Sequence, residues 1–137
     1  ASGWDRTRGE VVKFTSTGQA LGPGRGRTGA QILMQTLGPR PEHIGHVPVT
    51  DTADATAVAH ACFDQRARRL VVAEGTADGH PGLRVGVHVT IENVSPRFDN
   101  TYYVTETCHR YDVKAGEMTG GYYTDFEAEC AFLGVSR

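Results

Sequence analysis

The chain has 137 residues, of which 39% are hydrophobic and 22% charged, and its 14 basic and 16 acidic side chains leave a formal net charge of −2. This length is enough for one domain whose core buries about two-thirds of the surface of the unfolded chain. The balanced charge offers no field that would gather nucleic acid or an anionic membrane surface, so neither is an expected partner. We therefore expect a single domain over residues 1–137.

No stretch reaches the roughly 18 consecutive apolar residues of a membrane span, and no charged and then apolar leader pattern is seen. We expect neither membrane insertion nor a signal peptide. The three cysteines, Cys62, Cys108 and Cys130, are odd in number and widely spaced. A disulfide framework normally shows an even number in a shorter chain, so this set predicts buried, reduced thiols.

The first third of the chain predicts little regular structure. Residues 10–15 have the composition of a short strand, preceded by a turn at residues 4–7. Residues 16–48 are rich in glycine and proline, which cannot sustain a long regular element. We expect a long flexible excursion there, with one short strand or helical turn at residues 30–37. Excursions of this length often contact partners.

One helix is predicted, at residues 52–69. Asp51 or Thr52 can cap its first turn, and five alanines give it a high helical propensity. Arginines near its end complement the helix dipole. The predicted inward face carries Ala55, Ala59, Cys62, Phe63 and Leu70, while Asp64, Gln65 and Arg68 are predicted to point elsewhere.

Three later segments alternate apolar and polar residues with a period of two, the pattern of strands with one buried face. They cover residues 83–91, residues 102–111 after a turn at 98–100, and residues 122–132. In the last segment Phe126, Ala128, Cys130 and Phe132 alternate with Asp125, Glu127 and Glu129. Strands in series with short connections predict a mainly β, α+β fold: an antiparallel, barrel-like sheet with one covering helix.

Two patterns typical of ligand sites are weak here. Residues 24–29 match the glycine fingerprint of dinucleotide-binding proteins, with Asp51 downstream, but the strand before it and the parallel βαβ unit are not predicted. Glu42, His43 and His46 share a loop, yet no second pair of metal ligands recurs elsewhere. The sequence predicts no cofactor and no metal.

Acidic and aromatic side chains offer two further hypotheses. Asp125, Glu127 and Glu129 share a strand face, and Glu106 is expected opposite them, so paired carboxylates for hydrolysis of a sugar are conceivable. The same pattern occurs on strands that are merely solvated. The tyrosines at residues 102–123 are more typical of cross-strand packing than of stacking on bases or sugars.

Four short motifs follow one another between residues 79 and 126, and their order and spacing carry more information than any one alone. Their residues are Gly79, Pro81, Leu83, Gly86 and Val89; then Phe98, Tyr102, Val104 and Thr105; then His109 and Tyr111; then Gly121, Tyr122, Thr124 and Phe126. This series resembles the late-control protein D and VgrG-like family, the hub and spike proteins of contractile phage tails and related injection systems. Gly3-Trp4-Asp5 and the alanine-rich helix also match, so the resemblance covers about half of the chain.

The resemblance implies a structural role. Family hubs are homotrimers in which each subunit contributes two related barrel-like domains, so that a threefold ring presents a pseudo-sixfold face to a sixfold tube. The chain then corresponds to one hub domain of a larger protein, without the spike tip. Tube, baseplate and tip proteins are the implied partners, with assembly in the cytoplasm and residence in the particle. The motif residues are implied to be structural, with no catalytic residue.

One residue departs from the family pattern. Asn100 stands where relatives have glycine, and because Asn tolerates a left-handed backbone we expect the turn to be kept. His109 and Tyr111 are predicted to pack or to brace a turn. The excursion at 16–48 and the edge strands are the candidate contact surfaces.

Two alternatives remain open at this point. The first is an enzyme acting on cell wall or carbohydrate through Glu106, Asp125, Glu127 or Glu129. The second is an adaptor that binds cargo or a spike tip through the glycine-rich segment.

Overall fold

The computed structural model describes residues 1–112 and 121–134. Within these residues the secondary structure comprises eight strands and two helices: β1 (Ser2–Asp5), β2 (Glu10–Lys13), β3 (Arg27–Thr28), α1 (Gly29–Leu37), α2 (Thr52–Arg68), β4 (Val71–Asp78), β5 (His88–Ile91), β6 (Asn100–Asp112), β7 (Gly121–Cys130) and β8 (Phe132–Leu133). Neither of these helices is long and apolar enough to cross a membrane.

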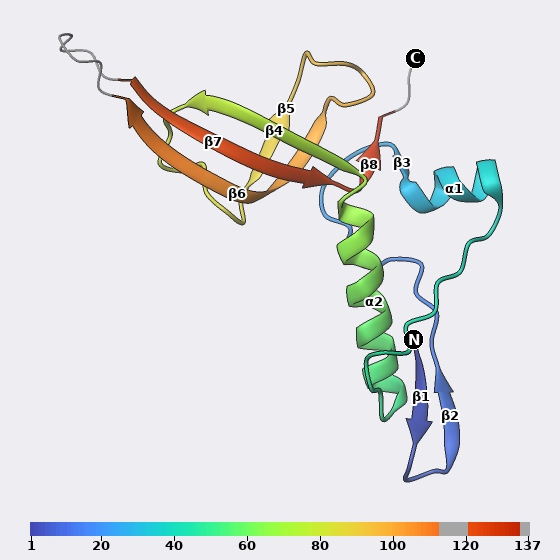
Figure 1. Cartoon of the computed structure of the whole chain (residues 1–137). Helices are drawn as coiled ribbons and strands as arrows, with labels where there is room; N and C mark the ends of the chain where they lie inside the picture. Colours follow the sequence, from blue (N-terminus) through green and yellow to red (C-terminus); the bar gives the residue numbers. More distant parts are fainter. Residues whose placement is uncertain (113–120, 135–137) are drawn as a thin grey trace.

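The main element is a four-stranded antiparallel sheet in the order β4-β7-β6-β5. Its long strands curl into a half-barrel at one end of the molecule (Figure 1). A bulge at Val104 and Glu106 shifts the register between β6 and β7, and such bulges increase the local bend of a strand. The predicted mainly β fold with a curled antiparallel sheet is thereby confirmed.

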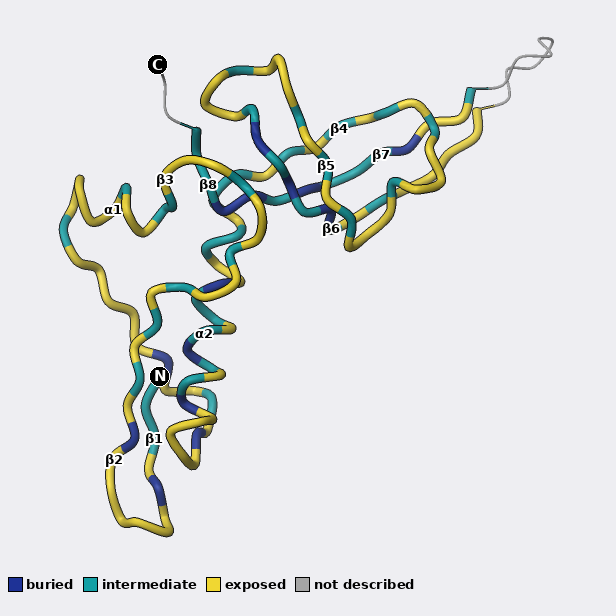
Figure 2. The backbone as a smooth tube through the Cα atoms, turned by 180° about the vertical axis from the view of Figure 1, so that it is seen from behind, coloured by how far each residue is buried: buried dark blue, intermediate teal, exposed yellow. Residues whose placement is uncertain are grey.

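The apolar face of this sheet forms the larger of two cores. Tyr102, Val104, Ala128 and Cys130 are buried there, at 2% exposure or less (Figure 2). Half-buried side chains packed around them are Val71, Ala73, Leu83, Val87, Val89, Ile91, Phe126 and Phe132. The alternation predicted for the last strand is therefore confirmed. All three cysteines, which lie in the described part of the chain, are free thiols.

The strands differ from the sequence prediction in two places. β4 was not predicted, because its inward residues are mainly small, and alanine and glycine give only a weak strand signal. The predicted strand at 83–91 shrinks to β5, because Gly86 takes a positive φ of 92° and the chain turns before it. Leu83 still packs against the core, so its apolar character reflects burial rather than strand structure.

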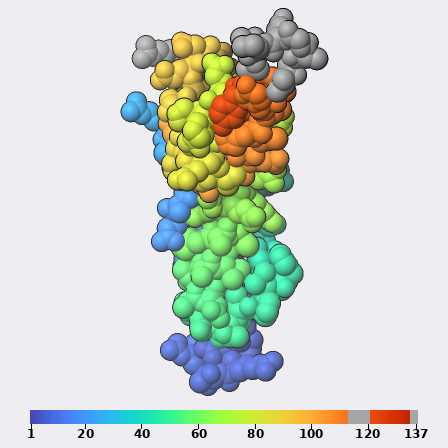
Figure 3. Space-filling view, turned by 90° about the vertical axis from the view of Figure 1, so that its left-hand side faces the viewer, coloured from blue at the N-terminus to red at the C-terminus, as the bar shows by residue number. Residues whose placement is uncertain are grey.

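α2 joins the sheet to a small hairpin at the opposite end. Asp51 caps the helix by accepting a hydrogen bond from the backbone N of Asp54 at 2.8 Å. The helix runs away from the end of the sheet and packs along the β1–β2 hairpin instead of lying across the sheet (Figure 1). The second core lies here, with buried Val12, Val49 and Ala55. Figure 3 shows the resulting stack of sheet, helix and hairpin from the side.

The excursion at 16–48 contains β3, which pairs with β8, and the nine-residue helix α1. It is tied to α2 by Asp64, whose carboxylate accepts hydrogen bonds from the backbone N of Gln19 at 2.9 Å and of Ala20 at 2.8 Å. The prediction that Asp64 points away from the packed face is wrong: its exposure is 5%. Two backbone donors compensate for the burial of its charge.

Candidate functional site

The first, third and last motifs meet at the end of the sheet where β4 turns back toward β5. The backbone N of Gly79 donates to the carbonyl O of Tyr122 at 2.7 Å. A Cβ atom on Gly79 would overlap the Tyr122 ring, so glycine is needed for this close approach. The first and last motifs are therefore two sides of one contact.

The second motif fixes the turn that precedes β6. Tyr102 is buried, and its hydroxyl donates to the carbonyl O of Phe98 at 2.7 Å. Burial is the main reason that the pKa of Tyr102 is raised, with smaller contributions from Cys130 and Asp99. The backbone N of Gly86 donates to the carbonyl O of Val104 at 3.0 Å, which ties the preceding loop to β6.

The third motif meets the last one at His109. Nδ1 of this ring lies 2.9 Å from the Tyr122 hydroxyl and 3.0 Å from the Thr124 hydroxyl. Thr124 is fully buried, and its oxygen accepts a hydrogen bond from the backbone N of His80 at 3.4 Å. The His109 and Tyr122 rings stack, with their centroids 5.9 Å apart. His109 therefore braces, through Thr124, the loop that follows β4, whereas Tyr111 is 64% exposed and does not pack.

Asn100 has a different role from the one predicted. It is the first residue of β6 and is 7% exposed, and the only described residue other than glycine with a positive φ is Asn93. The Asn100 side chain bonds the backbone of Arg25, accepting from N at 2.9 Å and donating to O at 2.8 Å. It also donates to the carbonyl O of Phe132. A turn is kept at residues 96–98, just before β6, but the left-handed backbone expected at Asn100 is wrong.

The opposite face of the sheet is polar and acidic. The register places Glu127 between Glu74 on β4 and Glu106 on β6, so three carboxylates form one cross-strand row. Like charges directly opposite one another destabilise a sheet. These residues line an open hollow of about 590 Å³, together with Gly75, Thr76, Cys108, Asp125 and Phe126. The predicted proximity of Glu106 and Glu127 is confirmed, while Glu74 was missed together with β4.

Asp125 lies in the next row but is engaged by other side chains. Arg110 donates to its two oxygens, from Nε at 2.5 Å and from Nη2 at 3.2 Å, and the Thr76 hydroxyl donates at 2.6 Å. The Arg110 hydrogen bond is the main reason that the pKa of Asp125 is lowered, and Thr76 adds to the effect. Arg110 also lies over the Tyr123 ring, 5.8 Å from its centroid. A carboxylate held in this way is a poor proton donor.

The two sequence patterns typical of ligand sites have structural explanations. β3 lies inside the glycine fingerprint and pairs antiparallel with β8, which does not fit a parallel dinucleotide-binding unit. Glu42 forms an ion pair with Arg66, and His43 lies 3.3 Å from the Ser2 hydroxyl. Among the described residues no group of three or more His, Cys, Asp or Glu is arranged to hold a metal ion.

A contact between Ser16 and His60 was not predicted from the sequence. The Ser16 Oγ lies 2.7 Å from Nδ1 of His60 and accepts a hydrogen bond from the backbone N of Gly18 at 3.1 Å. The His60 ring also packs on Phe14, with centroids 5.2 Å apart. Together with Asp64, these contacts fix the start of the excursion on α2. No local sequence pattern predicts the contact between Ser16 and His60, because the two residues are 44 positions apart in the chain.

Comparisons of the chain with family models, curated proteins and solved structures found no match.

Proposed function

We propose that this chain is a structural hub domain of a contractile injection apparatus, which adapts a threefold spike to a sixfold tube. One observation carries the proposal: several of the residues on which the family resemblance depends hold loops to the sheet. Gly79 meets Tyr122, and the Tyr102 hydroxyl meets the carbonyl of Phe98. The motifs therefore specify the shape of a β-module, which is what a mechanical component requires.

The open sheet supports an assembled state. Among residues 1–112 and 121–134, β4 and β5 are the outer strands of the sheet, and each pairs with a neighbour on one side only. Exposed edge strands offer backbone donors and acceptors to another chain. Closed rings of subunits are built through such repeated contacts. We infer that the edge strands contact neighbouring subunits and that the excursion at 16–48 contacts the tube and baseplate proteins.

The proposal is tested by following the chain into particles. An epitope-tagged copy is expressed in the source organism, and sheath-containing particles are purified on a density gradient. We expect the tagged chain to sediment with the sheath, and the Gly79→Val variant, which overlaps the Tyr122 ring, to be lost from the particles. Val94→Gln, at a residue that is 66% exposed, is the matched control and should be incorporated normally. A wild-type chain found only in sheath-free fractions would contradict the proposal.

An activity assay on the purified chain distinguishes a structural hub domain from an enzyme. The hub proposal expects no release of fragments from cell-wall or polysaccharide substrates. Turnover that disappears in Glu127→Gln and persists in Glu92→Gln, a carboxylate outside the acidic row, would replace the hub with a hydrolase.

A further inference from the structure

α1 presents an apolar stripe to solvent. Leu33, Met34 and Leu37 are 47%, 58% and 57% exposed, and Ala30 lies one turn before them on the same side. These positions follow the i, i+3, i+4, i+7 spacing of one helix face. Ile32, on the opposite side, is half-buried, and Gly29 lies against Leu70. The helix therefore rests on the molecule by one side while its more apolar side is uncovered.

This helix is formed without burying any of its nine residues. Isolated helices of this length are marginal in water. Here the ends are fixed: Thr28 and Gln31 form a capping box, and Nη1 of Arg27 donates to Oε1 of Gln35 at 2.7 Å. A preformed helix with an uncovered apolar stripe loses little entropy when a partner binds to it.

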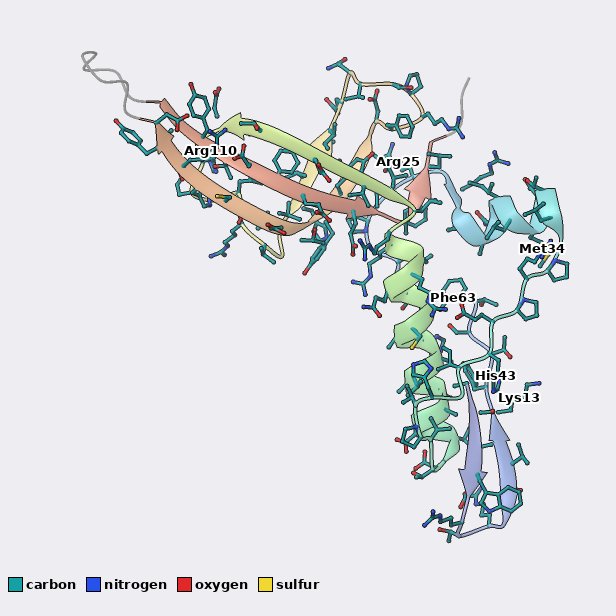
Figure 4. All side chains as sticks on the ribbon, in the orientation of Figure 1. Lys13, Arg25, Met34, His43, Phe63 and Arg110 are labelled. Atoms are coloured by element: carbon teal, nitrogen blue, oxygen red, sulfur yellow. The ribbon has the colours of Figure 1, made fainter. Side chains whose placement is uncertain are left out.

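A hollow of about 470 Å³ lies beside the stripe. It separates α1 from the start of the excursion and is lined by Thr17, Leu21, Thr28, Ala30, Gln31, Met34 and Gln35. Met34 is thus shared between the stripe and the hollow, and it lies on the side of the molecule remote from the sheet (Figure 4). The two features form one continuous surface, which we call the α1 surface.

The chain segment that carries the α1 surface has charged side chains of one sign only. Residues 16–41 contain no Asp or Glu, but they contain three arginines, Arg25, Arg27 and Arg40. All three are exposed, and none is in an ion pair with another described residue. Arg27 lies along α1 and reaches only the neutral amide of Gln35. An apolar stripe with an arginine rim is complementary to an apolar stripe with a carboxylate rim.

We propose that the α1 surface binds an amphipathic helix of a partner protein whose apolar face is flanked by Asp or Glu. Helix-in-groove recognition uses this combination of apolar anchors and charged rim. A second copy of the chain is less suitable, because the carboxylates of its acidic row stand on a sheet face and do not flank the apolar stripe of a helix. A membrane is also less suitable, since stable surface binding calls for a larger apolar face. This inference does not depend on the hub assignment.

The test uses the whole chain and a fluorescent synthetic peptide of about 18 residues, roughly five helical turns. The peptide carries Leu at heptad positions a and d, Glu at e and g, and Ala elsewhere. A matched peptide has Lys in place of Glu. In anisotropy titrations we expect the acidic peptide to bind, and the basic peptide to bind at least about tenfold more weakly.

Surface variants then locate the site. The double variant Leu33→Gln/Met34→Gln should weaken binding of the acidic peptide about tenfold, as loss of central apolar anchors does. Val94→Gln, which removes an apolar side chain that is even more exposed and lies elsewhere, should leave the affinity unchanged. Arg27→Gln should lower the affinity severalfold and flatten its salt dependence, whereas Arg84→Gln should do neither.

Four outcomes would overturn the proposal. The first is equal binding, or no binding, of the two peptides, and the second is an equal effect of Val94→Gln and the double variant. The third is binding to phosphatidylserine vesicles that the double variant abolishes while peptide binding persists, which would assign the surface to a membrane. The fourth is self-association of the wild-type chain that the double variant abolishes, which would assign it to a second copy.

Discussion

The two ends of the molecule are held together in different ways. At the sheet end, Tyr102, Val104 and Ala128 are buried in a continuous apolar core. At the helix and hairpin end, the core is small, and side chains such as Asp64 and His60 bind the backbone or hydroxyls of a distant segment. The first arrangement depends on apolar area removed from water, and the second on a few directed hydrogen bonds.

This difference predicts how far the destabilising effect of a mutation should extend through the molecule. Loss of a core side chain affects every strand that packs on it, because interiors are close-packed. Loss of a single hydrogen-bonding side chain should release mainly the segment it holds. Mutations should therefore affect the stability of the two ends differently. The predictions below begin with the mutation of largest expected effect.

Tyr102→Ala should have the largest effect. It removes a buried ring from the sheet core, and comparable aromatic truncations cost about 3–5 kcal/mol. Urea denaturation followed by circular dichroism measures the loss. Tyr123→Ala, at a residue 37% exposed on the polar face, is the control and should cost far less. Equal losses for the two variants would mean that the sheet core does not dominate stability.

Asp64→Ala should have an intermediate and local effect. Two backbone donors lose their acceptor, which costs about 1–3 kcal/mol. Hydrogen exchange should show lost protection at the amides of Gln19 and Ala20, with sheet amides unchanged. Gln65→Ala, at the exposed neighbouring position on α2, should change neither. Lost protection across β6 and β7 would show instead that the two ends unfold as one unit.

Tyr102→Phe should have a smaller effect than Tyr102→Ala, because the ring is kept. Losing the hydrogen bond to the carbonyl O of Phe98 should cost about 1 kcal/mol. The raised pKa of Tyr102 predicts a pH dependence of stability, because the phenol ionises at lower pH in the unfolded chain than in the folded one. The contribution of Tyr102 to stability is therefore present below the ordinary tyrosine pKa and is lost as pH rises through the raised value. The variant should show a weaker loss of stability at alkaline pH, and an unchanged alkaline profile would contradict this.

Arg110→Gln should have the smallest effect, confined to the polar face. The pKa of Asp125 should rise toward its ordinary value when its main hydrogen-bond donor is removed, as NMR titration of the carboxyl carbon would show. Because that pKa is lowered in the folded chain, the favourable contact exists above the ordinary aspartate pKa and is lost as pH falls through the lowered value. Thr76→Val should give a smaller rise, and no rise in either variant would contradict the assignment.

The sequence predicted the features that local periodicity records. Alternation over residues 122–132 gave the buried and solvated faces of β7, and Asp51 was recognised as a cap of α2. Alternation also brought Glu106 opposite Glu127, although their register depends on a bulge. These signals are local because neighbouring residues share one element.

The missed features depend on contacts between distant residues. Asp64 and Asn100 bind backbone groups 32 to 75 residues away, and a polar residue in such a position has no local signature. β4 was missed because small residues face its core, and Glu74 was missed with it. Of the α1 surface, the sequence predicted only a short strand or helical turn at residues 30–37. The exposure of its apolar side chains could not be predicted, because it depends on which distant segments pack against the helix.

The most direct test of the central claim is a cryo-electron microscopy reconstruction of particles that contain this chain, with threefold symmetry imposed only after alignment. We expect density for the curled sheet of β4, β7, β6 and β5 where the tube meets the spike, repeated around a threefold axis. Particles whose tube end lacks that density, while the tagged chain is found elsewhere in the cell, would contradict it.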